Sequence, residues 1–118
     1  MKEHKHIKLF TFNITVEMFD DIPEDMPEYA DGGVYDEPDD NFNFKVWFSF
    51  VRGIPKLQYI AHECWHLYMT VLKHIDSNEH AFEELNNEIY AYNFQDLFQN
   101  VLDALLSSKI YKKQVKEQ

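Results

Sequence analysis

The sequence predicts a single α+β domain in which two strands come first and two helices follow. Two stretches with alternating apolar residues, 6–19 and 42–51, precede two segments with helical character, 55–75 and about 79–106. Strands and helices therefore segregate along the chain, which is typical of an α+β fold. We expect a small antiparallel sheet of two or three strands, packed on both helices.

The length and composition allow one core and indicate a reducing environment. The chain has 118 residues, 45% of them hydrophobic and 16% aromatic, which suffices for one domain spanning residues 1–118. No apolar run reaches the roughly 18 residues that cross a bilayer, and the basic start lacks the apolar stretch of a secretory signal. The only cysteine, Cys64, excludes an internal disulfide. We therefore expect a cytoplasmic protein without a membrane segment.

Both predicted strands are rich in aromatic and β-branched residues. Such residues favour strands, and their alternation gives each strand one strongly apolar face. In the first strand the apolar set is Ile7, Leu9, Phe10, Phe12, Ile14, Val16 and Met18, and in the second it is Phe42, Phe44, Val46, Phe48 and Phe50.

The excess negative charge lies in one segment, residues 20–41. The formal net charge is -10, from 21 acidic and 11 basic side chains, and ten of the acidic residues fall in this segment. Its prolines and the pair Gly32-Gly33 disfavour regular structure, apart from a short extended piece around Val34 and Tyr35. We expect a solvated acidic loop that contributes little to the core. Alternatively, an acidic arm repels nucleic acid, attracts a basic partner or imitates a phosphate backbone.

The second half of the chain predicts two helices and a tail. Pro55 can open a helix, and residues 55–75 contain no further Pro or Gly and are apolar on most sides, which predicts a buried helix. Residues 76–78 end it and offer an N-cap for the second helix, about 79–106. The basic tail, residues 107–118, is expected to fray.

The first helix carries the motif His62-Glu63-Cys64-Trp65-His66. Residues four apart lie one above the other on a helix, so the two histidines can present imidazole nitrogens to one Zn²⁺ ion. Glu63 projects beside them, where it suits a general base that deprotonates a metal-bound water. The motif therefore predicts both metal binding and hydrolytic chemistry. The alternative without metal binding is a pair of histidines that are partly exposed or bonded to backbone groups.

A catalytic zinc usually takes a third protein ligand. His74 lies on the same helix about 12 Å beyond His66, given a rise of about 1.5 Å per residue, and is too far away. If the second helix folds back antiparallel, a residue two or three turns along it comes level with His66. Glu84 and Glu88 both meet this condition.

The motif and the segment after it resemble the gluzincin pattern, in which HExxH is followed by a helix bearing E-x-x-A. Here that helix reads Glu88-Ile89-Tyr90-Ala91. More narrowly, an aromatic strand that leads into the motif, followed by an E-x-Y-A-Y stretch, is similar to small zincin-like proteins encoded by bacteriophages and prophages. The resemblance covers about residues 42–100.

This resemblance implies a zinc metallopeptidase in which His62, His66 and Glu88 bind the metal and Glu63 is the general base. It also implies a bacterial host cytoplasm or a virion as the location. Larger gluzincins have an Asp after the alanine, where Tyr92 stands here. The carboxylate of Glu84 would then take the place of that Asp in supporting a ligand histidine.

Several other residues have a structural and a functional interpretation. Cys64 is off the histidine face and is expected to be a small core residue. Tyr90 and Tyr92 are more often core aromatics than donors that polarise a substrate carbonyl. The strand 42–51 can pair with an extended peptide, in which case Trp47 or Ser49 would line the cleft.

Three functions remain open on the sequence. The first is a zinc-dependent peptidase that uses Glu63 to activate water. The second is a non-catalytic zincin-fold binding or structural protein of phage origin, and the third is an acidic inhibitor of a host factor. The expected partner is a peptide or protein, and neither nucleic-acid binding nor membrane association is expected. The sequence does not predict an oligomeric state.

Overall fold

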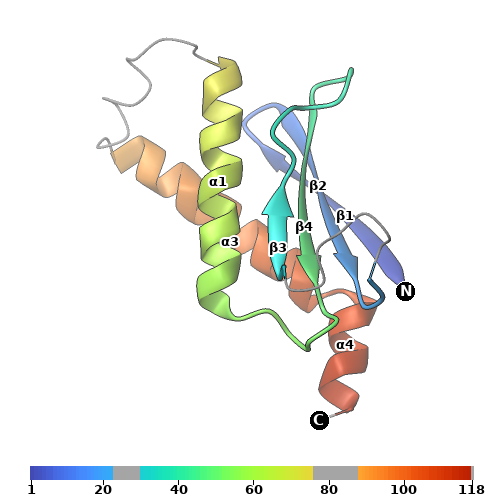
Figure 1. The fold of residues 1–118 in the computed structure, drawn as a ribbon. Coiled ribbons are helices and arrows are strands. Elements are labelled where there is room, and N and C mark those ends of the chain that lie inside the picture. Colours follow the sequence, from blue (N-terminus) through green and yellow to red (C-terminus); the bar gives the residue numbers. More distant parts are fainter. Residues whose placement is uncertain (23–29, 76–87, 118) are drawn as a thin grey trace.

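The computed structural model describes residues 1–22, 30–75 and 88–117, and over these residues it forms a mixed sheet covered by helices (Figure 1). The fold belongs to the α+β class, as predicted. The described elements are β1 (Lys2–Leu9), β2 (Phe12–Phe19), β3 (Gly32–Val34), β4 (Asn43–Ser49), α1 (Leu57–Ile75), α3 (Glu88–Leu106) and α4 (Lys109–Lys116).

The first predicted strand is in fact a hairpin of β1 and β2. Leu9 pairs with Phe12 across a two-residue turn, and Phe10 in this turn has a φ of 55°. Such a turn usually requires glycine or asparagine at positive φ, and neither is present. The prediction of one strand over 6–19 was therefore wrong, because the apolar alternation continues through the turn.

The sheet has the order β1-β2-β4-β3, and its central pair is parallel. β2 runs parallel to β4 with Val16 opposite Val46, whereas β1–β2 and β3–β4 are antiparallel. The prediction of an antiparallel sheet with two or three strands was thus wrong in both respects. The edge strand β3 comes from the acidic segment and confirms the short extended piece that was expected around Val34.

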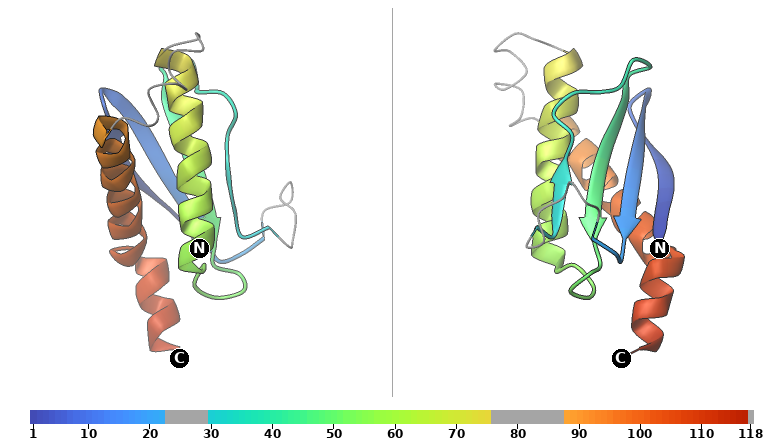
Figure 2. Two further views of the ribbon diagram at one scale, coloured as in Figure 1. Left: turned by 90° about the vertical axis from the view of Figure 1, so that its left-hand side faces the viewer. Right: turned by 45° about the vertical axis from the view of Figure 1, so that its right-hand side comes forward.

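α1 and α3 lie on one side of the sheet, and α4 continues from α3 beyond the end of the strands (Figure 2). α1 contacts β3 and β4, whereas α3 contacts β1 and β2, and the two helices also contact each other. A core of fully buried side chains lies between the sheet and these two helices. It includes Ile14, Val16, Met18, Phe44, Phe48, Leu67, Val71, Leu97 and Val101. The predicted apolar faces are therefore buried from Ile14 to Met18 and from Phe44 to Phe50, but Phe10 and Phe42, which were expected to belong to them, are 43% and 61% exposed. No helix in the described ranges is long and apolar enough to cross a membrane.

The helix α1 is buried on one side only. Cys64 and Leu67 are fully buried, but the side chain of Trp65 is 44% exposed, and His62 and His66 are exposed as well. The prediction of a helix buried nearly all round was wrong, because the sheet and α3 cover only part of its circumference. The exposed face is the one that carries the two histidines.

The tail forms a helix, α4, although fraying was expected. Ser108 caps it by accepting a hydrogen bond from the backbone N–H of Tyr111. The carboxylate of Glu3 accepts from the backbone N–H groups of Lys109 and Ile110, at 2.9 and 3.2 Å, and Ile110 is fully buried. A partner from β1, distant in sequence, thus stabilises the first turn of this helix.

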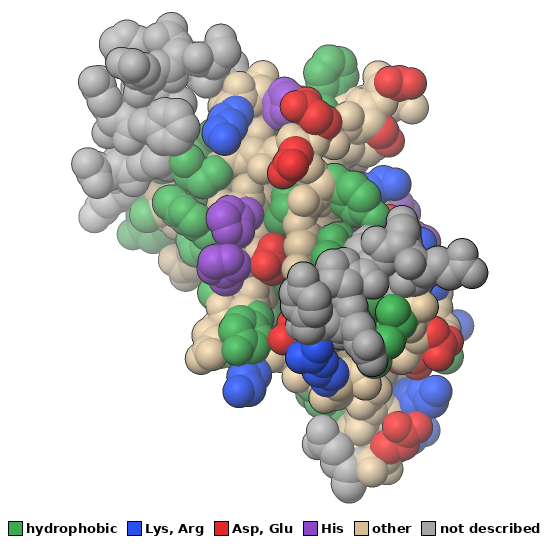
Figure 3. All heavy atoms as spheres, in the orientation of Figure 1, with side chains coloured by type: hydrophobic (Ala, Val, Ile, Leu, Met, Phe, Trp, Pro, Cys, Tyr) green, Lys and Arg blue, Asp and Glu red, His purple; other side chains and the backbone are tan. Residues whose placement is uncertain are grey.

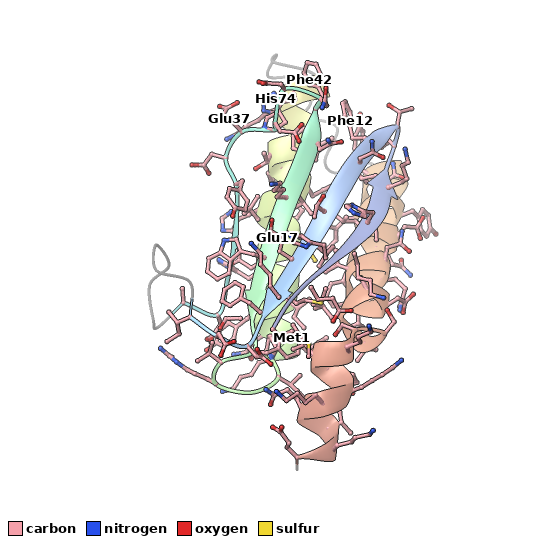
Figure 4. All side chains as sticks on the ribbon, turned by 90° about the vertical axis from the view of Figure 1, so that its right-hand side faces the viewer. Met1, Phe12, Glu17, Glu37, Phe42 and His74 are labelled. Carbon is pink, nitrogen blue, oxygen red and sulfur yellow. The ribbon has the colours of Figure 1, made fainter. Side chains whose placement is uncertain are left out.

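The sheet face opposite the helices carries a buried carboxylate, Glu17, which Figure 4 shows near the middle of β2. It is 5% exposed. Three groups surround it, with Nζ of Lys2 at 4.0 Å, Nε2 of His4 at 3.6 Å and Nζ of Lys45 at 3.8 Å. These basic groups compensate the burial of its charge.

The described part of the acidic segment is bound to the rest of the fold. Asp20 accepts a 2.6 Å hydrogen bond from the N-terminal ammonium group of Met1. Near the other end, a carboxylate oxygen of Glu37 lies 3.6 Å from Nε2 of His74, and both residues are labelled in Figure 4. Together with β3, these contacts show that residues 20–22 and 30–41 do not form merely a solvated loop.

Candidate metal centre

The helix α1 brings His62 and His66 together on its exposed face, as the spacing predicts. Their rings meet edge to face with centroids 4.6 Å apart, and their Nε2 atoms are separated by 3.1 Å. The two nitrogens therefore converge on one point outside the helix. The same separation also allows a hydrogen bond between the two rings, depending on their tautomers.

The histidine pair fits a zinc ion. Two nitrogen ligands, each about 2.0–2.1 Å from a tetrahedral zinc, lie about 3.4 Å apart, so the 3.1 Å separation of the Nε2 atoms requires only a small adjustment. Both side chains are exposed, which leaves the converging nitrogens accessible. His62 and His66 would be the two imidazole ligands.

Glu63 lies on the side of α1 that faces β3. A Cβ atom placed on Gly32 would be only 3.1 Å from Cγ of Glu63, so the glycine leaves room for this side chain against the edge strand. Partial burial raises the pKa of the Glu63 carboxyl above its ordinary value, although the charges of His62 and His66 oppose the shift. The carboxyl group is thus held beside the histidines in a half-buried position.

A cavity of about 410 Å³ opens around these three side chains and continues along α1 towards its C-terminal end. In Figure 3 two histidine side chains, in purple, lie on an open face next to an acidic side chain, in red. Val34 and Asp36 line the cavity from the side of the acidic segment, and Lys73 lines it from α1. The site therefore has room for a ligand larger than a metal ion.

α3 packs antiparallel against α1, which is the arrangement that the third-ligand argument assumes. The hydroxyl of Tyr68 donates a 2.8 Å hydrogen bond to the backbone carbonyl of Tyr90, and the rings of Trp65 and Phe94 are 5.4 Å apart. Later residues of α1 thus meet earlier residues of α3, which is an antiparallel arrangement.

Neither candidate for the third ligand has a described side chain. Glu88 is the first described residue of α3, but its side chain is outside the described part, and Glu84 is outside the described residues altogether. Within residues 1–22, 30–75 and 88–117, no three His, Cys, Asp or Glu side chains form a group that could hold a metal. The third ligand therefore stays a prediction.

The remaining candidate residues are found in different surroundings. Cys64 is fully buried, which agrees with its expected role in the core. The side chain of Tyr92 is 62% exposed, and Tyr90 lines a separate cavity with Phe10 and His74. That cavity shares no lining residue with the cavity at the motif. A role of Tyr90 or Tyr92 towards a substrate stays untested.

The strand nearest the motif is β3, which the sequence reasoning did not connect with the site. β4, the strand expected to receive a peptide, is paired on both sides, and its Trp47 and Ser49 are buried. The edge is β3 instead, and Gly32 lies against Glu63. The pair Gly32-Gly33 was the available signal, since glycine in a strand often marks the close approach of another group.

The two outer residues of β3 direct their backbone groups away from β4, to the side on which no other described strand pairs with β3. Ser49 N–H donates to the carbonyl of Asp31, and Tyr35 N–H donates to the carbonyl of Lys45. In an antiparallel ladder such residues alternate with residues that point away from the partner strand. Gly32 and Val34 therefore point their N–H and C=O groups away from β4.

Comparisons of the chain with protein-family models, with curated proteins and with solved structures gave no match.

Proposed function

We propose that this protein is a zinc-dependent peptidase with a minimal zincin-like domain. The observation that carries the proposal is the convergence of His62 and His66, whose Nε2 atoms are 3.1 Å apart, beside a half-buried Glu63. Glu88 is the proposed third ligand. Zinc, when bound, would polarise the scissile carbonyl and make water acidic enough to ionise near neutral pH.

The protein side chains would bind and orient the reactants and move the proton. The carboxylate of Glu63 would accept the proton of the attacking water and deliver it to the leaving amine nitrogen. Its fixed position against Gly32 reduces the motion needed to reach the water.

The edge strand β3 supports a polypeptide as the substrate. An extended chain can add to a sheet edge through main-chain hydrogen bonds, and Gly32 and Val34 direct such groups away from β4. A peptide bound there would pass the motif, because Val34 and Glu63 line the same cavity.

A non-catalytic zincin-fold binding protein is the alternative, and the exposure of both histidines leaves it open. The acidic-inhibitor hypothesis has less support than these two, because Asp20 and Glu37 contact basic groups of the same chain.

The variant Glu63→Gln tests the proposal, because glutamine keeps the shape of the side chain but cannot accept a proton. We expect the parent to bind one zinc per chain and to cleave members of a peptide library, and chelation to abolish the cleavage. Glu63→Gln should keep the zinc and lose about 10²–10⁴-fold in kcat/KM. Asp96→Asn, which removes a charge from the exposed face of α3, is the matched control and should cleave like the parent.

Two results would decide against the proposal. Zinc binding by the parent without cleavage of any library peptide would favour the non-catalytic alternative. Cleavage at the parental rate by Glu63→Gln would exclude Glu63 as the general base.

A further inference from the structure

The strand β1 forms the edge of the sheet opposite to β3. The order of the strands is β1-β2-β4-β3, and in the right-hand view of Figure 2 β1, in dark blue, is the outermost strand. It is eight residues long, from Lys2 to Leu9. No other described strand pairs with its outer side, so this side presents a row of backbone groups to which a further strand could add.

The ladder with β2 determines which residues of β1 point their backbone groups outwards. Leu9 and Phe12 close the two-residue turn, and at the other end the N–H group of Asp20 donates to the carbonyl of Met1. Residues that exchange hydrogen bonds with the partner strand alternate with residues that point away from it. Counted from either end, the odd-numbered residues of β1 bond to β2. The outward residues are Lys2, His4, His6 and Lys8.

These four outward residues are all basic, and their side chains share one face of the sheet. All four side chains are exposed, whereas the residues between them are buried or partly buried. Lys2 and His4 lie 4.0 and 3.6 Å from the carboxylate of Glu17, on the face opposite the helices. The same carboxylate is also 3.8 Å from Nζ of Lys45. Because one carboxylate serves several basic groups, the row keeps an excess of positive charge.

A cavity of about 570 Å³ lies along this edge. The four consecutive residues 5–8 line it, although alternate side chains of a strand point to opposite faces of a sheet. The cavity therefore follows the edge of β1 and not one face. Its other wall is the C-terminal part of α3, which includes Ala104. Asp103 on this wall accepts a 2.8 Å hydrogen bond from the side chain of Gln99.

A second copy of the chain is a poor partner for this edge. In a fully aligned antiparallel pair of two β1 strands, Lys2 would oppose Lys8 and His4 would oppose His6. Like charges directly opposite each other destabilise a sheet, so the basic row protects the edge from pairing with itself. The same row favours a strand with acidic residues at every second position, because each carboxylate would then lie opposite a basic side chain.

We infer that β1 binds an extended polypeptide segment with Asp or Glu at every second position, by adding it to the edge of the sheet. The outward residues from Lys2 to Lys8 span about 20 Å at about 3.3 Å per residue. Main-chain hydrogen bonds would supply affinity, and the basic row would select the acidic residues. The intervening side chains of the partner would enter the cavity beside α3. This surface is independent of the proposed peptidase function, since it lies at the opposite edge of the sheet from β3 and the motif.

Fluorescence anisotropy with synthetic peptides and the full-length chain tests the inference. The probe is a short labelled peptide in which Glu and Thr alternate. It is compared with a peptide that has Gln at each Glu position, and with a peptide of the same composition that has all Glu residues in one block. We expect the alternating peptide to bind about tenfold more tightly than either. A chelator should leave this binding unchanged, because zinc has no part in it.

Methylation of the peptide backbone separates strand addition from simple attraction of charges. Every second N–H group of an added strand faces β1, and the others face away. Methyl groups on one alternate set of peptide nitrogens should therefore abolish binding, whereas methyl groups on the other set should preserve it. Equal effects of the two sets, or equal binding of the alternating and block peptides, would overturn the inference.

Two double variants with the same loss of charge locate the binding surface. Lys2→Gln combined with Lys8→Gln should remove the preference for the alternating peptide. Lys112→Gln combined with Lys116→Gln, which removes two exposed lysines from α4, should preserve it, and thermal unfolding would show that both proteins are folded. A preference that survives the first combination or is lost with the second would contradict the assignment to β1. Tighter binding of a single-stranded oligonucleotide than of the alternating peptide would contradict the assignment of a polypeptide partner.

Discussion

The hydroxyl of Tyr68 donates a hydrogen bond of 2.8 Å to the backbone carbonyl of Tyr90. Tyr68 lies two residues beyond His66, and Tyr90 lies two residues beyond Glu88, so this bond ties the start of α3 to the helix of the motif. Burial raises the pKa of the Tyr68 hydroxyl to about 12, and the group therefore remains a donor over the whole physiological range.

The first prediction concerns the third metal ligand. Glu88→Ala should weaken zinc binding by orders of magnitude, because a carboxylate ligand neutralises part of the metal charge and completes the site. Glu84→Ala should weaken it only about 10–100-fold if that residue supports a ligand from outside the coordination shell. Competition with a chromophoric chelator at one pH would measure both affinities. The opposite ranking would assign Glu84 as the ligand.

The second prediction concerns the contact of β3 with Trp47. A Cβ atom on Gly33 would lie 2.6 Å from the Trp47 ring, so Gly33→Ala should lower the free energy of unfolding by about 1–3 kcal/mol. Thermal or urea unfolding would measure the loss. In a Trp47→Leu background the same substitution should cost clearly less, since the obstructing ring is gone. An equal cost in both backgrounds would show that the ring is not the reason for the glycine.

The third prediction concerns acid stability. The hydrogen bond from the N-terminal ammonium group of Met1, assisted by Lys113, lowers the pKa of Asp20 below its ordinary value of 3.8. A lowered folded-state pKa means that the stabilisation is complete above the unfolded-state pKa and is lost as the pH falls through the folded-state pKa. Asp20→Asn should therefore reduce stability at pH 6 and flatten its decline below about pH 4.

Asp21→Asn is the matched control for this substitution. Asp21 contacts the same ammonium group, but its side chain is 87% exposed against 11% for Asp20, so water screens the interaction. The melting temperature as a function of pH should thus change less than for Asp20→Asn. Identical curves for the parent and Asp20→Asn would show that the ion pair contributes nothing.

The fourth prediction concerns the thiol of Cys64. Burial raises the pKa of this thiol to about 12, and the side chain is fully buried. Only the thiolate reacts with alkylating reagents, so the folded protein should resist iodoacetamide at pH 8 and should react once unfolded in urea. Mass spectrometry would follow the reaction. Rapid alkylation of the folded protein, with or without zinc, would contradict the core position.

The apolar pattern of the sequence determined the class of the fold and the faces that form the core. Alternation of period two correctly predicted the buried faces of β2 and β4, with Val16 and Val46 in the core. The four-residue spacing of His62 and His66 also determined their convergence, because the geometry of a single helix fixes it. Such features depend on neighbours within a few residues, and local sequence is sufficient to specify them.

The arrangement of the strands and helices relative to one another is determined by the tertiary structure alone. It made β2 and β4 parallel, closed a hairpin turn at Phe10, and placed Gly32 of the acidic segment against Glu63. It likewise ordered the tail through the carboxylate of Glu3. Each of these contacts joins residues far apart in the chain or stabilises a conformation that local preferences disfavour. These contacts form because of the total free energy of packing, and the periodicity of hydrophobic residues in a short segment does not predict them.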